Sequence, residues 1–243
     1  MKIEKLLWDS EFFGINIGRL IVQNDKDFDA LRFIQQADDE KYELIYVFKF
    51  QNMLPWDKVL NAKLELVDLQ ITMSKAFHRE DFINFPYEIK NELSDKEKDE
   101  CYKIAEETSI VSRFYTEKKI GAPKAKELYR KWIDNSLNKS FSDGLFIIKD
   151  CNEIVGIHLI KTDKKENVGY CSVIGVNPNK KRIQIGRKLW EQSFGYWANE
   201  SKIEICKVPF SILNLESFNF HLKMGFNKTE EIKYIYHYRN NTR

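Results

Sequence analysis

The chain has 243 residues and a mass of 28.9 kDa, which suits one large domain or two small ones. Apolar residues make up 43% and aromatic residues 14% of it, so the composition favours a packed core over disorder. With 39 basic and 37 acidic side chains the net charge is only +2, which argues against nucleic acid or an anionic membrane as a partner. No stretch approaches the ~20 apolar residues of a spanning helix, and no signal-peptide core follows Met1, which predicts a cytoplasmic protein.

The first 85 residues are predicted to form a small α/β unit. An apolar segment that starts at Ile17 precedes the turn signal Asn24-Asp25, and apolar residues then recur at helical spacing up to the acidic residues 38–40. Two β-rich runs follow at residues 44–48 and 64–73, with a short helix opened by Pro55 between them.

Residues 86–105 are dense in charge, and we expect a solvated helix or a linker there, at the boundary between two units. The second unit, residues 106–243, shows the order β-β-β-α-β-α-β after a first amphipathic helix. Its expected elements are a helix at 123–138, strands at 145–148, 154–160 and 168–176, a helix at 185–198, a strand at 203–208, a helix at 214–223 and a strand at 232–238.

The four cysteines are widely spaced, and no histidine accompanies them at the spacing of a metal site. This pattern disfavours disulfides and a structural zinc ion, so we expect no metal. Cys171 and Cys206 fall within predicted strands and lack an evident base, which indicates core residues rather than nucleophiles.

A basic loop separates the strand that ends at Val176 from the helix that begins near Ile185. A helix N-terminus leaves backbone N–H groups unpaired and carries roughly +0.5 of a charge, so this loop can bind a pyrophosphate. Lys181, Arg182 and Arg187 would add charge to such a site. On spacing alone, a basic turn before an ordinary helix is the more frequent explanation.

A second segment starts with Asn214, a good helix cap, and ends with Gly225, which suits the position after the helix. Together the two segments resemble the GNAT acetyltransferases, a superfamily of acetyl-CoA-dependent N-acetyltransferases. The family pattern Val-x-Pro-x-x-Arg-x-x-Gly-x-Gly is matched, with Lys for Arg and Gln for the first Gly, by Val176, Pro178, Lys181, Gln184 and Gly186. The pattern Asn-x-x-Ala-x-x-x-Tyr-x-x-x-Gly-Phe is matched, with Ser for Ala and His for Tyr, by Asn214, Ser217, His221, Gly225 and Phe226.

The resemblance covers about residues 106–243 and implies an α/β fold with a mixed central sheet flanked by helices. It implies that acetyl-CoA is the co-substrate and that the strand at 168–176 pairs with its pantetheine arm. The residues that the resemblance assigns to the cofactor are Val176, Lys181, Arg182, Ile183, Gln184, Ile185, Gly186, Arg187 and Asn214.

The resemblance places catalysis at His221 and Asn214. His221 stands where many GNAT enzymes have the tyrosine thought to protonate the departing CoA thiolate. Histidine could serve as imidazolium or as a neutral N–H donor. The alternative is that His221 only packs near the cofactor sulfur, while a tyrosine or solvent supplies the proton.

The opening segment Trp8 to Gly14, with Arg19 after it, resembles the dTDP-fucosamine acetyltransferase family, in which a partial GNAT-like unit precedes the catalytic unit. The segment Ser112-Arg113-Phe114-Tyr115 also resembles that family. The implied substrate is a nucleotide-linked amino sugar of the dTDP-4-amino-4,6-dideoxyhexose type, and a homodimer is plausible by the same resemblance. Arg113 is a candidate for the substrate diphosphate, with a domain-bridging ion pair as an equal alternative. Tyr170 is a candidate at the acceptor amine, beside Glu166 and Ser172.

Other functions remain open at this point. The same fold could acetylate an aminoglycoside, a polyamine or a protein N-terminus. The departures at Gln184 and His221 also allow a CoA-binding regulatory protein without turnover.

Overall fold

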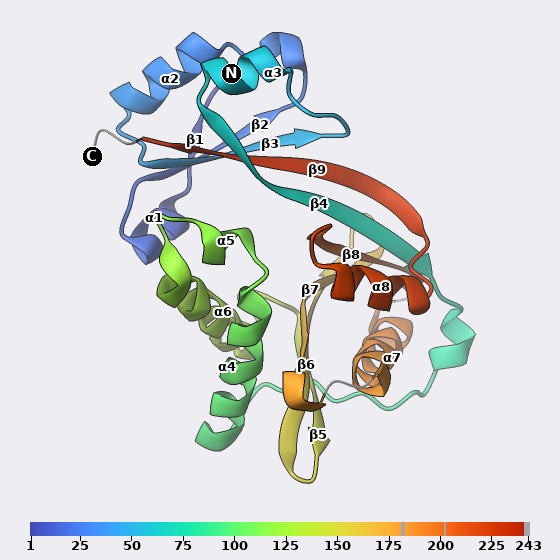
Figure 1. The fold of residues 1–243 in the computed structure, drawn as a ribbon. Coiled ribbons are helices and arrows are strands. Elements are labelled where there is room, and N and C mark those ends of the chain that lie inside the picture. Colours follow the sequence, from blue (N-terminus) through green and yellow to red (C-terminus); the bar gives the residue numbers. More distant parts are fainter. Residues whose placement is uncertain (181–182, 202, 241–243) are drawn as a thin grey trace.

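A computed structural model describes residues 1–180, 183–201 and 203–240, which form one nine-stranded mixed sheet (Figure 1). The spatial order of the strands is β1-β2-β3-β9-β4-β8-β7-β6-β5. In chain order the strands are β1 (Glu4–Lys5), β2 (Ile17–Val22), β3 (Leu44–Phe50), β4 (Leu64–Ala76), β5 (Gly144–Asp150), β6 (Glu153–Asp163), β7 (Val168–Val176), β8 (Ile205–Ser211) and β9 (Lys228–Arg239).

Helices cover both faces of this sheet, and alternation along single strands identifies the faces. On β3, Ile45 and Val47 pack with the helices of one face, whereas Leu44 and Tyr46 pack with those of the other. The first face carries α2 (Ala30–Asp39), α3 (Trp56–Asn61), α7 (Ile183–Glu200) and α8 (Leu215–Lys223). The second face carries α1 (Leu7–Phe13), α4 (Asp95–Ser109), α5 (Arg113–Thr116) and α6 (Gly121–Leu137).

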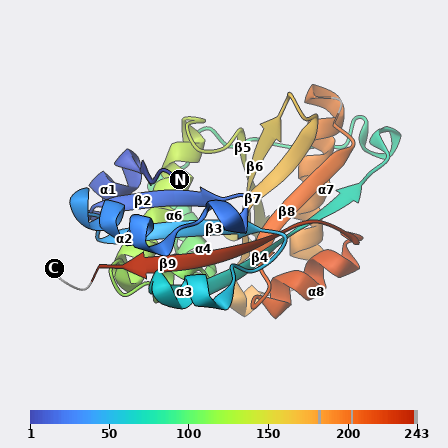
Figure 2. The same cartoon turned by 90° about the horizontal axis from the view of Figure 1, so that it is seen from above.

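The chain contains two β-α-β-α-β units that exchange their last strands. The units are β2-α2-β3-α3-β4 and β7-α7-β8-α8-β9, and each starts with a parallel strand pair. The last strand of the first unit, β4, pairs with β8, and the last strand of the second unit, β9, pairs with β3. The two exchanged strands also pair with each other, side by side in the middle of the sheet (Figure 2). The two expected units therefore share a single sheet, and their boundaries at residues 85 and 106 stay a prediction.

The order of elements in the second half confirms the sequence prediction, and strand β7 has the predicted bounds. Helix α4 occupies much of the charge-dense segment. A capping box of Ser94 and Glu97 starts it, and Cys101, Ile104 and Ala105 bury one face. The sequence analysis missed β1 and α1, where no side chain caps the helix start at Leu6.

Two further expectations concern the cysteines and membrane-spanning helices. Cys171 and Cys206 are free thiols at 4% and 0% exposure in the core, as predicted. Among the described residues, none of the helices is both long and apolar enough to cross a bilayer.

Candidate active site

The parallel strands β7 and β8 separate soon after they begin. They pair only over Val168–Tyr170 and Ile205–Lys207, although each strand continues for several residues. A register shift in the β6–β7 pairing, where Ser172 is left out of the ladder, bends β7 near the point of separation. The inner edge of β7 from residue 171 to residue 176 is therefore left without β8 as a partner.

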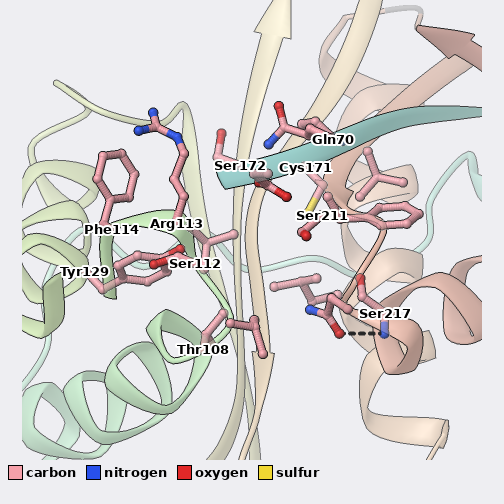
Figure 3. Close-up of a pocket in the computed structure, with 18 of the residues that line it drawn as sticks. Gln70, Thr108, Ser112, Arg113, Phe114, Tyr129, Cys171, Ser172, Ser211 and Ser217 are labelled. Carbon is pink, nitrogen blue, oxygen red and sulfur yellow. Dashed lines mark hydrogen bonds between the residues drawn. The ribbon is translucent and has the colours of Figure 1, made fainter. Parts of the chain in front are cut away.

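A pocket fills the space where the two strands diverge. One wall comes from α4, α5 and α6, and the other from β4, β7, β8 and the start of α8 (Figure 3). Polar groups on the sheet side include Gln70, Ser172 and Ser211, and they face Thr108 and Tyr129 across the pocket (Figure 3). The pocket thus connects the α4–α6 face of the sheet with the α7–α8 face.

The start of α8 borders this pocket through Asn214 and Ser217. Asn214 caps the helix as predicted, because its Oδ1 accepts a hydrogen bond of 3.0 Å from the Ser217 backbone N–H (Figure 3). Gly225 ends the helix with φ of 88°, a conformation that favours glycine. Asn214 and Ser217 therefore sit at the positive end of the α8 dipole, beside the opening between the strands.

His221 lies one turn further along α8 and is fully buried. Its ring stacks on Phe210 at a centroid distance of 5.4 Å and meets Trp190 edge-on at 5.8 Å. Burial lowers its pKa to about 4, so the imidazole is neutral near pH 7. Phe210 lines the pocket and lies against the imidazole, so His221 is placed behind the pocket wall.

The predicted phosphate loop is described in part. Lys181 and Arg182 lie outside the described residues, and Ile183 is the first residue of α7. Gln184 and Arg187 are exposed at the start of the helix. Val176 and Ile185 are half-buried and pack against the core under α7.

Gly186 is buried and brings α7 close to α8. A Cβ atom there would lie 2.7 Å from Cζ of Phe220, closer than any normal contact. Glycine at this position therefore has a packing reason, separate from the cofactor contact that the motif implies.

Arg113 lines the pocket from α5 and is held between aromatic rings. Its guanidinium carbon lies 4.0 Å from the ring centroid of Phe114 and 4.4 Å from that of Tyr46. The Nη1 atom is buried and has no hydrogen-bond partner among the described residues. The nearby carboxyl of Asp9 has its pKa raised by burial, an effect that Arg113 and Arg19 oppose.

A second cation approaches the same region from β9. The Lys233 Nζ and the Arg113 guanidinium carbon each lie 5.8 Å from the ring centroid of Phe48. Lys233 donates a 2.9 Å hydrogen bond to Oε1 of Gln70, a residue of the pocket wall. Burial is the main cause that lowers the Lys233 pKa; Glu231 and Asp68 oppose this shift, and Arg113 adds to it.

The sequence analysis missed Asp68, which lies in the pocket wall at 8% exposure. A bulge between Leu66 and Asp68 turns this carboxylate toward the pocket face of β4. Its Oδ1 is buried and lacks a hydrogen-bond partner among the described residues. The sequence signal for Asp68 is weak, because the same strand also carries Glu65, Gln70 and Lys75.

The structure does not bring Tyr170 into this pocket. Tyr170 borders a separate hollow with Lys161 to Lys164, near the turn between β6 and β7. Among the described residues, there is no group of three or more His, Cys, Asp or Glu side chains that could hold a metal ion.

The sheet opens between two parallel strands beside a helix N-terminus, which offers a ligand an open strand edge and unpaired backbone N–H groups. Residues 100–226, more than half of the chain, match the sequence model of the acetyltransferase (GNAT) family. The chain belongs to this family, has its fold, and is an acetyl-CoA-dependent N-acetyltransferase.

Two solved structures share this fold over most of the chain. A functionally unknown conserved protein from Staphylococcus epidermidis is 10% identical with a TM-score of 0.63, over 99% of this chain and 92% of that one. A GCN5-related N-acetyltransferase from Kribbella flavida is 11% identical with a TM-score of 0.52, over 91% and 80% of the two chains. At these identities the likeness concerns the fold alone. No curated protein matches the sequence.

Proposed function

We propose that the protein acetylates the amine of a nucleotide-linked amino sugar by direct attack of that amine on acetyl-CoA. The sugar we propose is of the dTDP-4-amino-4,6-dideoxyhexose type. The observation that carries the choice of an anionic acceptor is the pair of cations, Arg113 and Lys233, that converge on the Phe48 ring.

The pocket supports direct transfer because it joins the two faces of the sheet. In this proposal acetyl-CoA lies along the open edge of β7, with its phosphates near the start of α7 and its thioester near Asn214. The acceptor enters from the side of α4, α5 and α6. The sheet then holds the amine and the thioester in contact, which replaces a bimolecular encounter by an oriented one.

Arg113 and Lys233 are both cations near the Phe48 ring and repel each other, while Glu231 and Asp68 attract Lys233. An anionic ligand would add to that attraction. Neither Arg113 nor Lys233 forms an ion pair with a described residue, and Arg113 has a free buried N–H group. A guanidinium with a neighbouring ammonium group matches the two phosphates of a nucleoside diphosphate. The aromatic rings beside Arg113 fix it in place without neutralising it.

Asp68 supplies the complementary charge for the amine. Its partly unpaired carboxylate lines the pocket, and an acceptor that arrives as an ammonium ion would satisfy the buried oxygen. The amine must lose a proton before it attacks the thioester, and we assign the passage of that proton to solvent through Asp68. A role for Tyr170 at the amine, a homodimer and a cytoplasmic location stay predictions.

The test is thiol release from acetyl-CoA with dTDP- and UDP-linked amino sugars, a polyamine and an aminoglycoside. We expect turnover with a dTDP-4-amino sugar. In Arg113→Gln the KM for this sugar should rise roughly 10- to 100-fold, since a hydrogen bond to a charged group contributes about 1.5–3 kcal/mol. The KM for acetyl-CoA should not change.

Arg130→Gln is the matched control, because Arg130 is exposed on α6, forms an ion pair with Glu106, and is not among the residues that line the pocket. Asp68→Asn should lower turnover with every amine that the enzyme accepts. Turnover with the polyamine alone, or an unchanged sugar KM in Arg113→Gln, would contradict the proposed acceptor.

A further inference from the structure

Two departures from the GNAT pattern touch each other in the folded protein. Ser217 stands at the usual alanine position and His221 at the usual tyrosine position, one helical turn apart. The Ser217 Oγ lies 3.2 Å from Nδ1 of His221. Ser217 borders the pocket, whereas His221 is fully buried behind it.

The hydrogen bonds of His221 define its tautomer. Nδ1 lies 2.8 Å from the backbone carbonyl oxygen of Ser217. A carbonyl oxygen can only accept, so Nδ1 must carry the hydrogen. The same N–H group then also points at the Ser217 hydroxyl oxygen, which acts as an acceptor at 3.2 Å.

This arrangement leaves the hydroxyl hydrogen of Ser217 unused. A helical serine commonly donates its hydroxyl to a carbonyl one turn back, as Ser136 does to Trp132 at 2.6 Å. Ser217 makes no such bond within the described residues, because it is the third residue of α8 and the residue four positions back, Leu213, precedes the helix. Its hydroxyl instead lies against the His221 N–H group. A hydroxyl that accepts on one side and faces a pocket on the other can donate into that pocket.

The position of Ser217 favours a negative partner. It is the third residue of α8, and the Asn214 cap holds its backbone N–H at 3.0 Å. The first turn of a helix carries partial positive charge. A developing thiolate beside Ser217 would therefore meet both a hydroxyl donor and the helix dipole.

We propose that the Ser217 hydroxyl donates a hydrogen bond to the sulfur of acetyl-CoA as it leaves, and that His221 orients this hydroxyl from behind. The neutral amine nitrogen bonds to the acetyl carbon and releases one N–H proton to solvent, the bond from that carbon to sulfur breaks, and the electron pair stays on sulfur. The thiolate is stabilised by the Ser217 O–H and is later protonated by solvent. Ser217 is the catalytic residue in this step, and His221 is a positioning residue.

The inference rests on the acetyl transfer proposed above but not on the identity of the acceptor. It is therefore tested first with CoA alone, by titrating the thiolate absorbance of CoA bound to the intact protein. Ser217→Ala should raise the pKa of the bound thiol by about one unit or more, as expected for the loss of a hydrogen bond to a charged group. Ser217→Thr keeps the hydroxyl and should keep the wild-type value.

His221→Phe keeps the ring that packs on Phe210 but removes the N–H group. It should raise the thiol pKa less than Ser217→Ala does, and the double variant should match Ser217→Ala, because His221 acts through Ser217. Ser136→Ala is the control, since its hydroxyl is already bound within α6.

With any amine that supports turnover, Ser217→Ala should lower kcat by about tenfold at an unchanged KM for acetyl-CoA. An unchanged thiol pKa in Ser217→Ala, or additive shifts from Ser217→Ala and His221→Phe, would overturn the inference. If the wild-type enzyme acetylates none of the nucleotide sugars, the proposed acceptor is wrong. The CoA titration then still decides the role of Ser217.

Discussion

Among single residues, the histidines stand out because three of the four in the sequence are buried. His158, His221 and His237 are each at or below 1% exposure. In each ring Nδ1 has a partner: the hydroxyl of Ser193 for His158, the Ser217 carbonyl for His221, and Glu117 for His237. The Nε2 atom of each ring has no partner among the described residues. Burial lowers the pKa of all three rings, for His237 in spite of its contact with the Glu117 carboxylate, so each ring is neutral near pH 7.

The stability of the protein should therefore fall in mild acid. Burial lowers the pKa of His221 to about 4, against about 6.5 in an unfolded chain. A depressed pKa gives stability that is complete above pH 6.5 and is lost as the pH falls toward 4, because the unfolded chain binds the proton first. Denaturant unfolding should show a loss approaching roughly 3 kcal/mol from this ring over that interval. His221→Phe should make the dependence shallower, while His158 and His237 keep their share of it; an equal slope in both proteins would contradict the assignment.

The residue scale also shows where sequence reasoning stops. The positions of Asn214 and Gly225 follow from local rules for helix ends, and both predictions are confirmed as caps. The direction in which His221 points does not follow from such rules, because it depends on Phe210 and Trp190, which come from β8 and α7. The side of the sheet on which Asp68 lies depends on a bulge, because a bulge reverses the face of every residue that follows it.

At the scale of helices and strands, a glycine at the contact between α7 and α8 lets the two helices pack closely. Gly186 leaves room for the ring of Phe220, and Gly169 on β7 likewise leaves room for Trp197 of α7. In both places a Cβ atom would fall within 3 Å of an aromatic ring. The glycines thus let α7 lie close to both the sheet and the helix that carries Asn214.

Gly186→Ala should destabilise the protein although alanine is the better helix former by about 1 kcal/mol. The new Cβ would meet Cζ of Phe220 at 2.7 Å, and overpacking of this kind typically costs about 1–3 kcal/mol. We expect a net loss in thermal and denaturant unfolding. Adding Phe220→Leu should restore part of the lost stability, because it removes the clashing ring end; equal instability of the single and double variants would place the clash elsewhere.

Element type and order were largely predictable because each element carries its own periodicity. The run Leu189, Trp190, Phe194 and Trp197 shows the buried face of α7 in the sequence alone, and all four are at or below 1% exposure. Helix α4 was harder, since its charged face dominates the composition while Cys101 and Ile104 form only a narrow buried stripe. A helix with so narrow a buried face is recognised only when the elements that pack against it are known.

The whole molecule is held together by pairings between distant parts of the chain. The exchange of β4 and β9 joins residues 70–76 to 205–211 and residues 44–50 to 233–239. No local pattern specifies such partners, so the sequence predicted the strands but not their order in the sheet. Glu117, just after α5, adds a further tie, because it binds His237 and Arg239 of β9. These bonds fix the segment that carries Arg113 to the exchanged strand.

The two halves should therefore fold only together. A fragment of residues 106–243 lacks β4, so that β8 loses one partner and β9 loses both of its neighbours. Unpaired strand edges and an exposed core then favour aggregation. We expect this fragment, and residues 1–85 alone, to be insoluble or unfolded by circular dichroism and size exclusion.

Coexpressed fragments 1–91 and 92–243 are the matched control, because the cut lies between the exposed Asn91 and Glu92 and keeps every strand. These fragments should associate into a soluble complex with the thiol-release activity of the intact chain, since the exchanged strands supply the contacts between them. A separate 106–243 fragment that melts cooperatively at the temperature of the intact protein would show that the second half needs no strand from the first. In that case β4 would be a cover on the catalytic half rather than a part of its fold.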